Sequence, residues 1–478
     1  MKRTGRLATL GAALIIGLAT SSAHAFHERK IAHVPHAPAH PSGGKLDNGL
    51  ISLTRLVPPI TRVFDYSGDI WHRGTMLGDF GGARSDWYEK GFTLDAQLTQ
   101  VYQGVTSGGS VAGNGNDKYN GLFEINASLD TAKLGWWSGG LISATVQTGF
   151  GSPISGETGN ISPVNMTPLW PDPFQSTTEV TEYYLTQGLP HEISMVVGRI
   201  DATNFLDKNT FANIPEAQFF NASLNNNLLW GELLTFSTYA LLVVVPVTEN
   251  FTFATGVWTP ETQPDDANGD WGSFGAVINP MFKYHLGGKA GAVQATYAYA
   301  SNNTAAFDNP HYAPNLLSDF LVSGTGIDSK GDNWLVTLNG EQFLWTPQGR
   351  KEDYAVGTQD FAANPPGIGL FYRAAFMPEN RNPYNLTMSG GLGARGIIPG
   401  RPYDRMGIGV YAMFASDDFK DASPLLNALM DDETGFEAYY NFAVTPWVQI
   451  SADVQYIDQG ISTSDEAWVF GSRLSLRF

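Results

Sequence analysis

The chain has 478 residues and no cysteine, and its formal net charge is −18. Without cysteine it has no disulfides, zinc–thiolate sites or cysteine nucleophiles. So acidic a chain is also a poor match for a nucleic-acid partner, because phosphate contacts need lysine and arginine. The length exceeds that of an ordinary soluble domain, although one closed β-barrel reaches it without a deep core.

The first 25 residues have the pattern of an export signal. Basic residues open the chain, an apolar run covers 7–19, and the segment ends in Ala23-His24-Ala25. This pattern predicts a secretory signal peptide that is cleaved before Phe26. The alternative is an N-terminal anchor helix, but the apolar run is too short to span a bilayer.

Residues 26–68 form a lead in which histidine and proline are interleaved. We expect a flexible periplasmic tether without bound metal, and a metal-binding tract is the alternative. Residues 69–90 are expected to form a short segment at the periplasmic mouth of the fold. The histidines and prolines of the lead are His27, His33, His36, His40, Pro35, Pro38 and Pro41.

From residue 91 onward the hydrophobic pattern has a period of two. Trp468 and Phe470 share one face of segment 467–478 with other large apolar residues, whereas Arg473 and Arg477 lie on the opposite face. An arginine facing lipid near the midplane would cost about 2–4 kcal/mol, so the arginine face is expected to line a lumen. After the signal, no apolar run approaches the ~18 residues of a membrane helix, so strands would cross the membrane.

The alternation recurs in sixteen segments, and single-chain bacterial outer-membrane barrels have an even number of strands. We therefore predict an all-β fold, a transmembrane antiparallel β-barrel over residues 91–478 that lies among outer-membrane lipids. The expected strands are 91–104, 119–131, 140–150, 178–188, 192–199, 234–247, 251–258, 273–286, 291–301, 333–345, 367–377, 385–396, 406–415, 435–444, 447–457 and 467–478.

The lengths of the connections fit this fold. If the first strand runs outward, the external connections are long and the periplasmic turns are mostly short, as is typical of such barrels. Only the stretch 346–366 is long where a short turn is expected. A soluble β-sandwich, the alternative fold, would have similar loops at both ends. The external loops would be 105–118, 151–177, 200–233, 259–272, 302–332, 378–384, 416–434 and 458–466.

Six groups of motifs along the chain occur in the order found in one known family. They are Gly78–Arg84 with Glu89–Phe92, Gly198–Asp201 with Phe219–Asn221, Gly369–Ala374, Pro399–Asp404 with Gly407–Val410, Glu437–Asn441 with Thr445–Trp447, and Asp453–Ile457 with Trp468–Phe478. Together they cover about residues 75–478 and resemble the OprB-type carbohydrate-selective porins. The resemblance implies a sixteen-stranded barrel, passive uptake of sugars such as glucose, and no cofactor.

The candidate site lies on the inward strand faces and in two long loops. Charged side chains exchange hydrogen bonds with sugar hydroxyls, and aromatic rings offer flat apolar surfaces. Loops 151–177 and 200–233 are long enough to fold into the bore. The four prolines of loop 151–177 suit a fixed shape inside a pore, but an ordinary exposed loop is an equal alternative. The pore-constriction candidates are Glu124, Trp170, Glu182, Tyr184, Arg199, Asp201 and Arg373. For each of them the alternative is a solvated wall residue.

Other functions are weighed against the sugar porin. A barrel hydrolase needs a nucleophile with a nearby base, and His311, the one histidine in a long external loop, has no recognisable nucleophile motif beside it. A gated, energy-coupled transporter needs a plug domain, for which residues 26–90 are too few. A general porin, or one for organic acids or ions, is the main alternative. We expect no enzyme activity, a monomer or a trimer, and recognition of Phe478 by the barrel assembly machinery.

Overall fold

The structure is a computed structural model that describes residues 66–478, apart from 67, 111–116, 173–175, 235–236, 261–271, 302–303, 308–327, 348–365 and 423. The expected signal peptide, almost all of the His/Pro-rich lead, His311 and most of the stretch 346–366 therefore lie outside the described residues.

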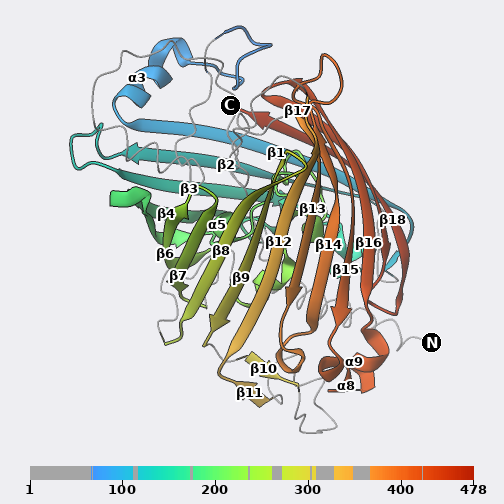
Figure 1. The fold of residues 1–478 in the computed structure, drawn as a ribbon. Coiled ribbons are helices and arrows are strands. Elements are labelled where there is room, and N and C mark those ends of the chain that lie inside the picture. Colours follow the sequence, from blue (N-terminus) through green and yellow to red (C-terminus); the bar gives the residue numbers. More distant parts are fainter. Residues whose placement is uncertain are drawn as a thin grey trace.

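Within the described ranges, sixteen strands close into one antiparallel β-barrel, which confirms the predicted fold (Figure 1). Each strand pairs with its neighbour along the chain, and β18 closes the ring on β1 through pairs such as Leu98 with Leu476. The barrel strands are β1 (Phe92–Ser110), β2 (Asp117–Asp130), β3 (Gly140–Gly151), β4 (Thr178–Gly188), β5 (Ser194–Ile200), β6 (Thr238–Thr248), β7 (Phe251–Trp258), β8 (Gly275–Leu286), β9 (Lys289–Ala300), β12 (Asn333–Trp345), β13 (Gly367–Phe376), β14 (Tyr384–Arg395), β15 (Arg405–Ala415), β16 (Glu433–Thr445), β17 (Val448–Asp458) and β18 (Ser464–Arg477).

Short elements occupy the connections. Strands β10 (Thr304–Ala306) and β11 (Asp328–Lys330) form a small separate sheet within the expected loop 302–332. No helix in the described part of the chain is long and apolar enough to cross a membrane. The helices and 3-10 turns are η1 (Phe80–Gly82), α3 (Ala83–Glu89), α4 (Ser155–Thr158), η2 (Thr167–Leu169), η3 (Pro190–Glu192), α5 (Thr203–Leu206), α6 (Ala222–Asn225), η4 (Leu228–Glu232), η5 (Glu379–Arg381), α8 (Asp417–Asp421) and α9 (Pro424–Leu429).

The alternation of side chains along the strands matches the predicted faces. On β18, Phe470 is 50% exposed on the outer surface, whereas Arg473 is 1% exposed and lies inside the barrel. β1 is longer than expected, because it continues to Ser110 and pairs there with Ser464 at the start of β18. β6 begins at Thr238 rather than at 234, because Leu234 is buried among the residues that fill the barrel.

Two external connections fold into the barrel. We call residues 152–172 inner segment 1 and residues 201–234 inner segment 2. Almost every side chain of inner segment 2 is buried, including Trp230. The helices α5 and α6 belong to this segment, which appears in green inside the ring of strands in Figure 1. The two loops that the sequence singled out are thus the ones that occupy the bore.

One wall of the barrel is apolar on both of its faces. On β6, Leu242 and Val244 are buried on the inside and pack in one cluster with Leu228 and Trp230 of inner segment 2, while Leu241 is exposed on the outside. A strand covered on both faces needs apolar side chains at every position. This explains the uninterrupted apolar run of β6. Similar inward residues on neighbouring strands are Val196, Ala254, Val277, Ala298 and Leu335.

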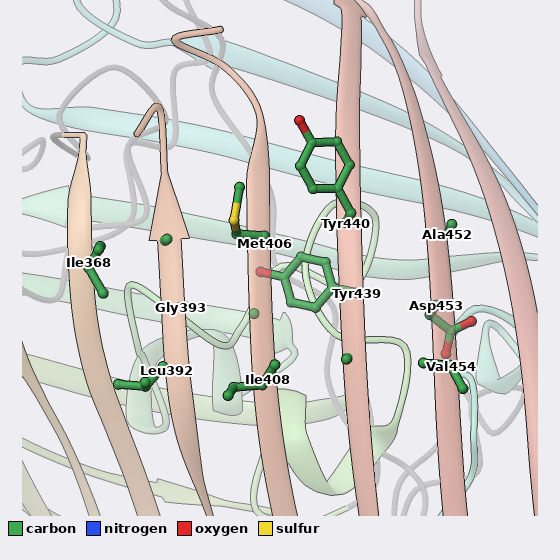
Figure 2. A pocket seen from close by; sticks show the side chains of 13 residues that line it. Ile368, Leu392, Gly393, Met406, Ile408, Tyr439, Tyr440, Ala452, Asp453 and Val454 are labelled. Atoms are coloured by element: carbon green, nitrogen blue, oxygen red, sulfur yellow. The ribbon is translucent and has the colours of Figure 1, made fainter. Parts of the chain in front are cut away.

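The outer wall carries a hollow over strands β13 to β17. Its volume is about 560 Å³. Figure 2 shows the outward side chains of Leu392, Ile408 and Met406, with the short side chain of Ala452 on a nearby strand. Ala394 and Ala438 also line the hollow. The hollow therefore arises where small residues on adjacent strands interrupt an otherwise bulky apolar surface.

The segment before β1 lies across the place where the barrel closes. The main-chain nitrogen of Met76 donates to the oxygen of Arg477 at 2.8 Å, and Arg84 Nη2 donates to the oxygen of Phe478 at 3.0 Å. The nitrogen of Phe478 in turn donates to the oxygen of Ala96 on β1 at 2.9 Å. The expected short segment 69–90 is thus attached to the end of β18.

Candidate functional site

Three of the predicted site residues, Glu124, Glu182 and Asp201, belong to one cluster of hydrogen-bonding groups at the inner face of β2 to β4. Glu124 accepts a hydrogen bond from Asn126 at 2.6 Å. The Thr145 hydroxyl lies 3.1 Å from both Glu182 and the side-chain oxygen of Asn126, and its single proton can be donated to either one. Glu182 also accepts from the main-chain nitrogen of Asp201 at 3.3 Å. The register of the strands brings these groups together, because Asn126 pairs with Thr145, and Thr145 pairs with Glu182.

Tyr184, an aromatic residue of the same wall, contacts an aromatic and a cationic group of inner segment 2. The rings of Tyr184 on β4 and Phe205 on α5 meet edge to face, with centroids 6.4 Å apart. The Lys208 ammonium lies 5.7 Å from the centroid of the Phe205 ring. Glu182 and Tyr184 are each 7% exposed, Phe205 is 8% and Lys208 is 9% exposed, in contrast to values near zero in the packed centre of inner segment 2.

Arg199 and Asp201 come from the end of β5, where the chain enters inner segment 2. Arg199 pairs with Tyr183 in the register of β4 and β5, and its side chain is buried. Asp201 is buried directly after the strand. Because Glu182 bonds the Asp201 nitrogen, the same glutamate also fixes the beginning of inner segment 2.

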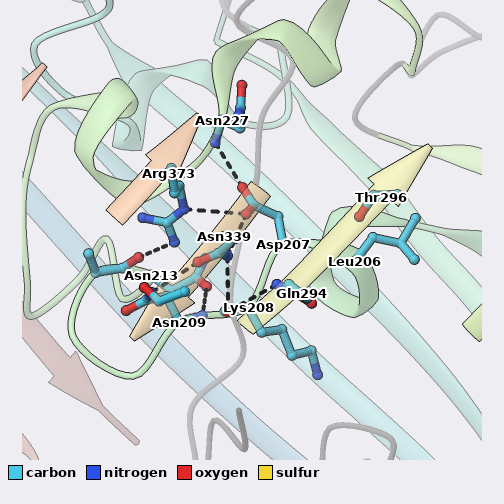
Figure 3. A network of polar contacts seen from close by, with 12 residues as sticks. Leu206, Asp207, Lys208, Asn209, Asn213, Asn227, Gln294, Thr296, Asn339 and Arg373 are labelled. Atoms are coloured by element: carbon cyan, nitrogen blue, oxygen red, sulfur yellow. Dashed lines mark hydrogen bonds and ion pairs between the residues drawn. The ribbon is translucent and has the colours of Figure 1, made fainter. Parts of the chain in front are cut away.

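The structure places Arg373 away from this group, beneath inner segment 2. Its Nε lies 3.3 Å from Oδ1 of Asp207, and its other nitrogens donate to the oxygens of Ala212 and Leu224 at 2.5 and 3.2 Å. Figure 3 shows Asp207 at the centre of this network, where it also accepts from Asn339 on β12. Arg373 faces inward as expected, but its hydrogen-bonding capacity is used by the chain itself.

Trp170 also lies within the packed interior. It is 2% exposed near the end of inner segment 1 and belongs to the large apolar cluster of the barrel. A side chain at Gly149 on β3 would meet the Trp170 oxygen at 2.4 Å, so the segment lies directly against the wall there. Inner segment 1 is therefore folded against the barrel wall, as one of the two interpretations of loop 151–177 predicts.

Glycines on the inner face make room for the rings of inner segment 2. A Cβ at Gly369 on β13 would lie 2.1 Å from the Phe211 ring, and one at Gly393 on β14 would lie 2.7 Å from its Cβ. Phe211 stacks edge to face on Phe343 with a centroid distance of 4.8 Å. Thr210, the preceding residue, donates its hydroxyl to Glu341 at 2.8 Å. Inner segment 2 is therefore held by a polar contact to the wall and packs against small residues there.

The geometry is that of a closed barrel whose bore is narrowed by two inward-folded connections, and comparison with known proteins agrees. The family model of the carbohydrate-selective porins, OprB family, matches residues 116–478. The chain belongs to this family. Its sequence is 22% identical over 441 residues to Porin B of Pseudomonas aeruginosa, a match that covers 84% of this chain and 91% of Porin B.

Solved structures show the same fold. The high-pH structure of Pseudomonas putida OprB matches with a TM-score of 0.73 at 20% identity, over 86% of this chain and 100% of that chain. The low-pH structure of the same protein matches with a TM-score of 0.51 at 17% identity, over 85% and 99% of the two chains.

Sequence reasoning missed several residues of the porin interior. Phe205, Asp207 and Lys208 lie in an aperiodic loop, where no pattern indicates which side chains face a wall. Glu437 occupies an inward position on β16, but its partners are 216 and 217 residues away along the chain. The sequence did contain a signal for such a contact, because Glu437 is an acidic residue at an inward strand position. Among the described residues, no group of three or more histidine or acidic side chains could hold a metal ion.

Proposed function

We propose that this porin lets small carbohydrates such as glucose diffuse passively across the outer membrane. The proposal rests on one observation, which is that the two sides of the bore differ in polarity and packing. The inner wall around β6 is apolar and packed against inner segment 2, whereas the inner wall of β1 to β4 is polar. The family to which the chain belongs supports sugars as the solute class.

The solute route would run between α5 and the polar wall. Glu182 and Glu124 would exchange hydrogen bonds with sugar hydroxyls, as charged acceptors do readily. Tyr184 and Phe205 would offer apolar edges and faces to the sugar ring. Such contacts must stay weak, because a solute that binds tightly would not leave the pore. We assign Arg199 and Asp201 to the same route.

Arg373 and Trp170 have a different role in this proposal. Arg373 bonds Asp207 and two main-chain oxygens, and the main-chain oxygen of Trp170 lies close to Gly149 on the wall. These contacts support a role in holding the inner segments rather than in touching solute.

Export and assembly complete the proposal. The N-terminal pattern of residues 1–25 supports cleavage before Phe26 and insertion in the outer membrane. Phe478 would be recognised by the barrel assembly machinery during insertion. In the folded chain its ring packs near Phe123, with centroids 6.3 Å apart. The porin would act as a monomer or a trimer without enzyme activity.

Liposome swelling tests the substrate class. Purified porin is reconstituted and exposed to a panel of sugars, amino acids and organic acids of matched size. The proposal expects faster entry of monosaccharides than of other solutes of equal size, together with a fall in single-channel conductance when glucose is added. Rates that depend on size alone would show a general porin, and a preference for carboxylates would show an organic-acid porin.

The named residues are tested in the same assay. Glu182→Gln and Arg199→Ala should weaken glucose block of single channels, because each removes a charged partner for a hydroxyl. Glu89→Gln on the exposed face of α3 is the matched control. Unchanged conductance and unchanged sugar block in both variants would remove these residues from the route.

A further inference from the structure

Strand β16 holds both inner segments through two buried glutamates. Glu437 accepts hydrogen bonds from the main-chain nitrogens of Phe220 and Asn221 at 2.6 and 2.8 Å. Glu433 accepts from the main-chain nitrogens of Ile161 and Ser162 at 2.5 and 2.9 Å. Each carboxylate thus takes two consecutive N–H groups, one pair from each inner segment.

The two attachment points lie side by side on one face of one strand. Glu433 and Glu437 are four residues apart and both are 0% exposed, as expected for inward positions on a pleated strand. Gly435 lies between them, and the Tyr411 ring occupies the space above it. The Tyr411 hydroxyl donates to Glu433 at 3.0 Å.

The two inner segments are also bonded to each other at this place. The nitrogen of Ala222 donates to the oxygen of Pro163 at 2.9 Å. The hydroxyls of Ser162 and Ser223 lie 2.8 Å apart. Strand β16 is therefore a shared attachment point for both segments, and each segment reinforces the attachment of the other there.

We propose that Glu433 and Glu437 are positioning residues that set the width of the solute route by fixing both inner segments to β16. The inference rests on the proposed conduction of solutes through the bore. A carboxylate has two acceptor oxygens and suits two N–H donors, whereas glutamine has one acceptor oxygen and an NH₂ group. In Glu437→Gln, one main-chain N–H would face the amide NH₂ and lose its partner, although the side chain keeps its size.

The test measures pore width independently of sugar. Single-channel conductance is recorded with polyethylene glycols of graded mass, and the smallest excluded polymer gives the effective width. Glu437→Gln and Glu433→Gln are each expected to admit larger polymers and to raise the ratio of trisaccharide to monosaccharide swelling rates several-fold. The double variant should exceed either single variant. Glu89→Gln is the matched control.

A disulfide separates positioning from general stability. Because the chain has no cysteine, Ser162→Cys and Ser223→Cys can be added to Glu437→Gln to join the segments. The oxidised triple variant should regain the wild-type polymer cut-off, since segment 2 is then held through segment 1 and Glu433. Reduction should abolish the rescue.

The outcomes distinguish the inference from the proposed function. Folding is checked by the mobility shift of unheated barrels in gels. If the wild-type porin excludes large polymers but shows no preference for sugars, the proposed substrate is wrong and the inference is still tested. If the folded double variant keeps the wild-type cut-off, the inference is wrong. Should Glu437→Gln fail to fold, Glu433→Gln gives the same test for inner segment 1.

Discussion

Arg373 on β13 and Asp207 in inner segment 2 form a buried ion pair, in which Nε and Oδ1 are 3.3 Å apart and each side chain is 1% exposed. Removing one partner leaves the other charge buried and uncompensated, which destabilises proteins by about 3–5 kcal/mol. We therefore expect Asp207→Ala and Arg373→Ala to lower the free energy of unfolding by this amount, measured by urea denaturation in lipid vesicles. The double variant should lose less than the sum.

The pair between Arg381 and Asp332 provides the control. Its atoms approach to 2.5 Å, but the Asp332 side chain is 47% exposed. Solvent-exposed pairs contribute about 0–1 kcal/mol, so Asp332→Ala should change the unfolding free energy little. A similar loss in both pairs would contradict the assignment of Asp207 as a buried anchor.

The contact between Gly369 and Phe211 predicts a steric effect. Gly369→Ala would place a Cβ 2.1 Å from the Phe211 ring, and overpacking of this kind costs about 1–3 kcal/mol. In a double-mutant cycle, Phe211→Ala should relieve most of this loss. Gly156→Ala is the control, because no heavy atom lies within 4 Å of the added carbon. Additive effects of Gly369→Ala and Phe211→Ala would contradict the contact.

One side of the bore is packed against inner segment 2, whereas the wall of β1 to β4 is polar. This difference predicts which positions react with water-soluble reagents. In the cysteine-free chain, Gln97→Cys and Ser128→Cys on the polar wall should react with a charged methanethiosulfonate, and the conductance should fall. Ala298→Cys, at 0% exposure against inner segment 2, should not react. Equal reaction at all three positions would show that the bore is open on both sides.

Tyr66 predicts a loss of stability at alkaline pH. Burial raises the pKa of its hydroxyl above the ordinary value of 10.0, and the nearby Asp95 charge raises it further, whereas Arg84 lowers it. Because the folded-state pKa exceeds the unfolded one, the contribution is fully present below pH 10 and declines as the pH rises above it. The Tyr66→Phe variant should lose less stability than the wild type between pH 9 and pH 11. Parallel stability curves would contradict this.

The barrel could be predicted from the sequence because the membrane imposes a local rule. Alternation along β18 indicates its inward face, since an arginine such as Arg473 cannot face lipid without a large penalty. The contents of the bore follow no such local rule. The strand pattern predicts that Arg373 faces inward, as it does, but its partner Asp207 lies 166 residues earlier in the chain. The strand register alone gives no sign of that contact.

The same limit explains the wall that is apolar on both faces. In β6 the alternation disappears, and the run around Leu242 resembles a short buried strand of a soluble protein. Its inner side chains are apolar because Trp230 and its neighbours cover them. The contacts of Phe205 with Tyr184 and with Lys208 depend on the same packing, so Phe205 and Lys208 carry no period-two signal.

The burial of inner segment 2 has a consequence for the order of biogenesis. The segment is fastened to Asn339 on β12 and to Glu437 on β16, both synthesised long after it, and its apolar side faces β6. These attachments can form only once β12 and β16 have taken their places in the sheet. Inner segment 2 therefore reaches its final position late in folding, and the bore gains its final width only then.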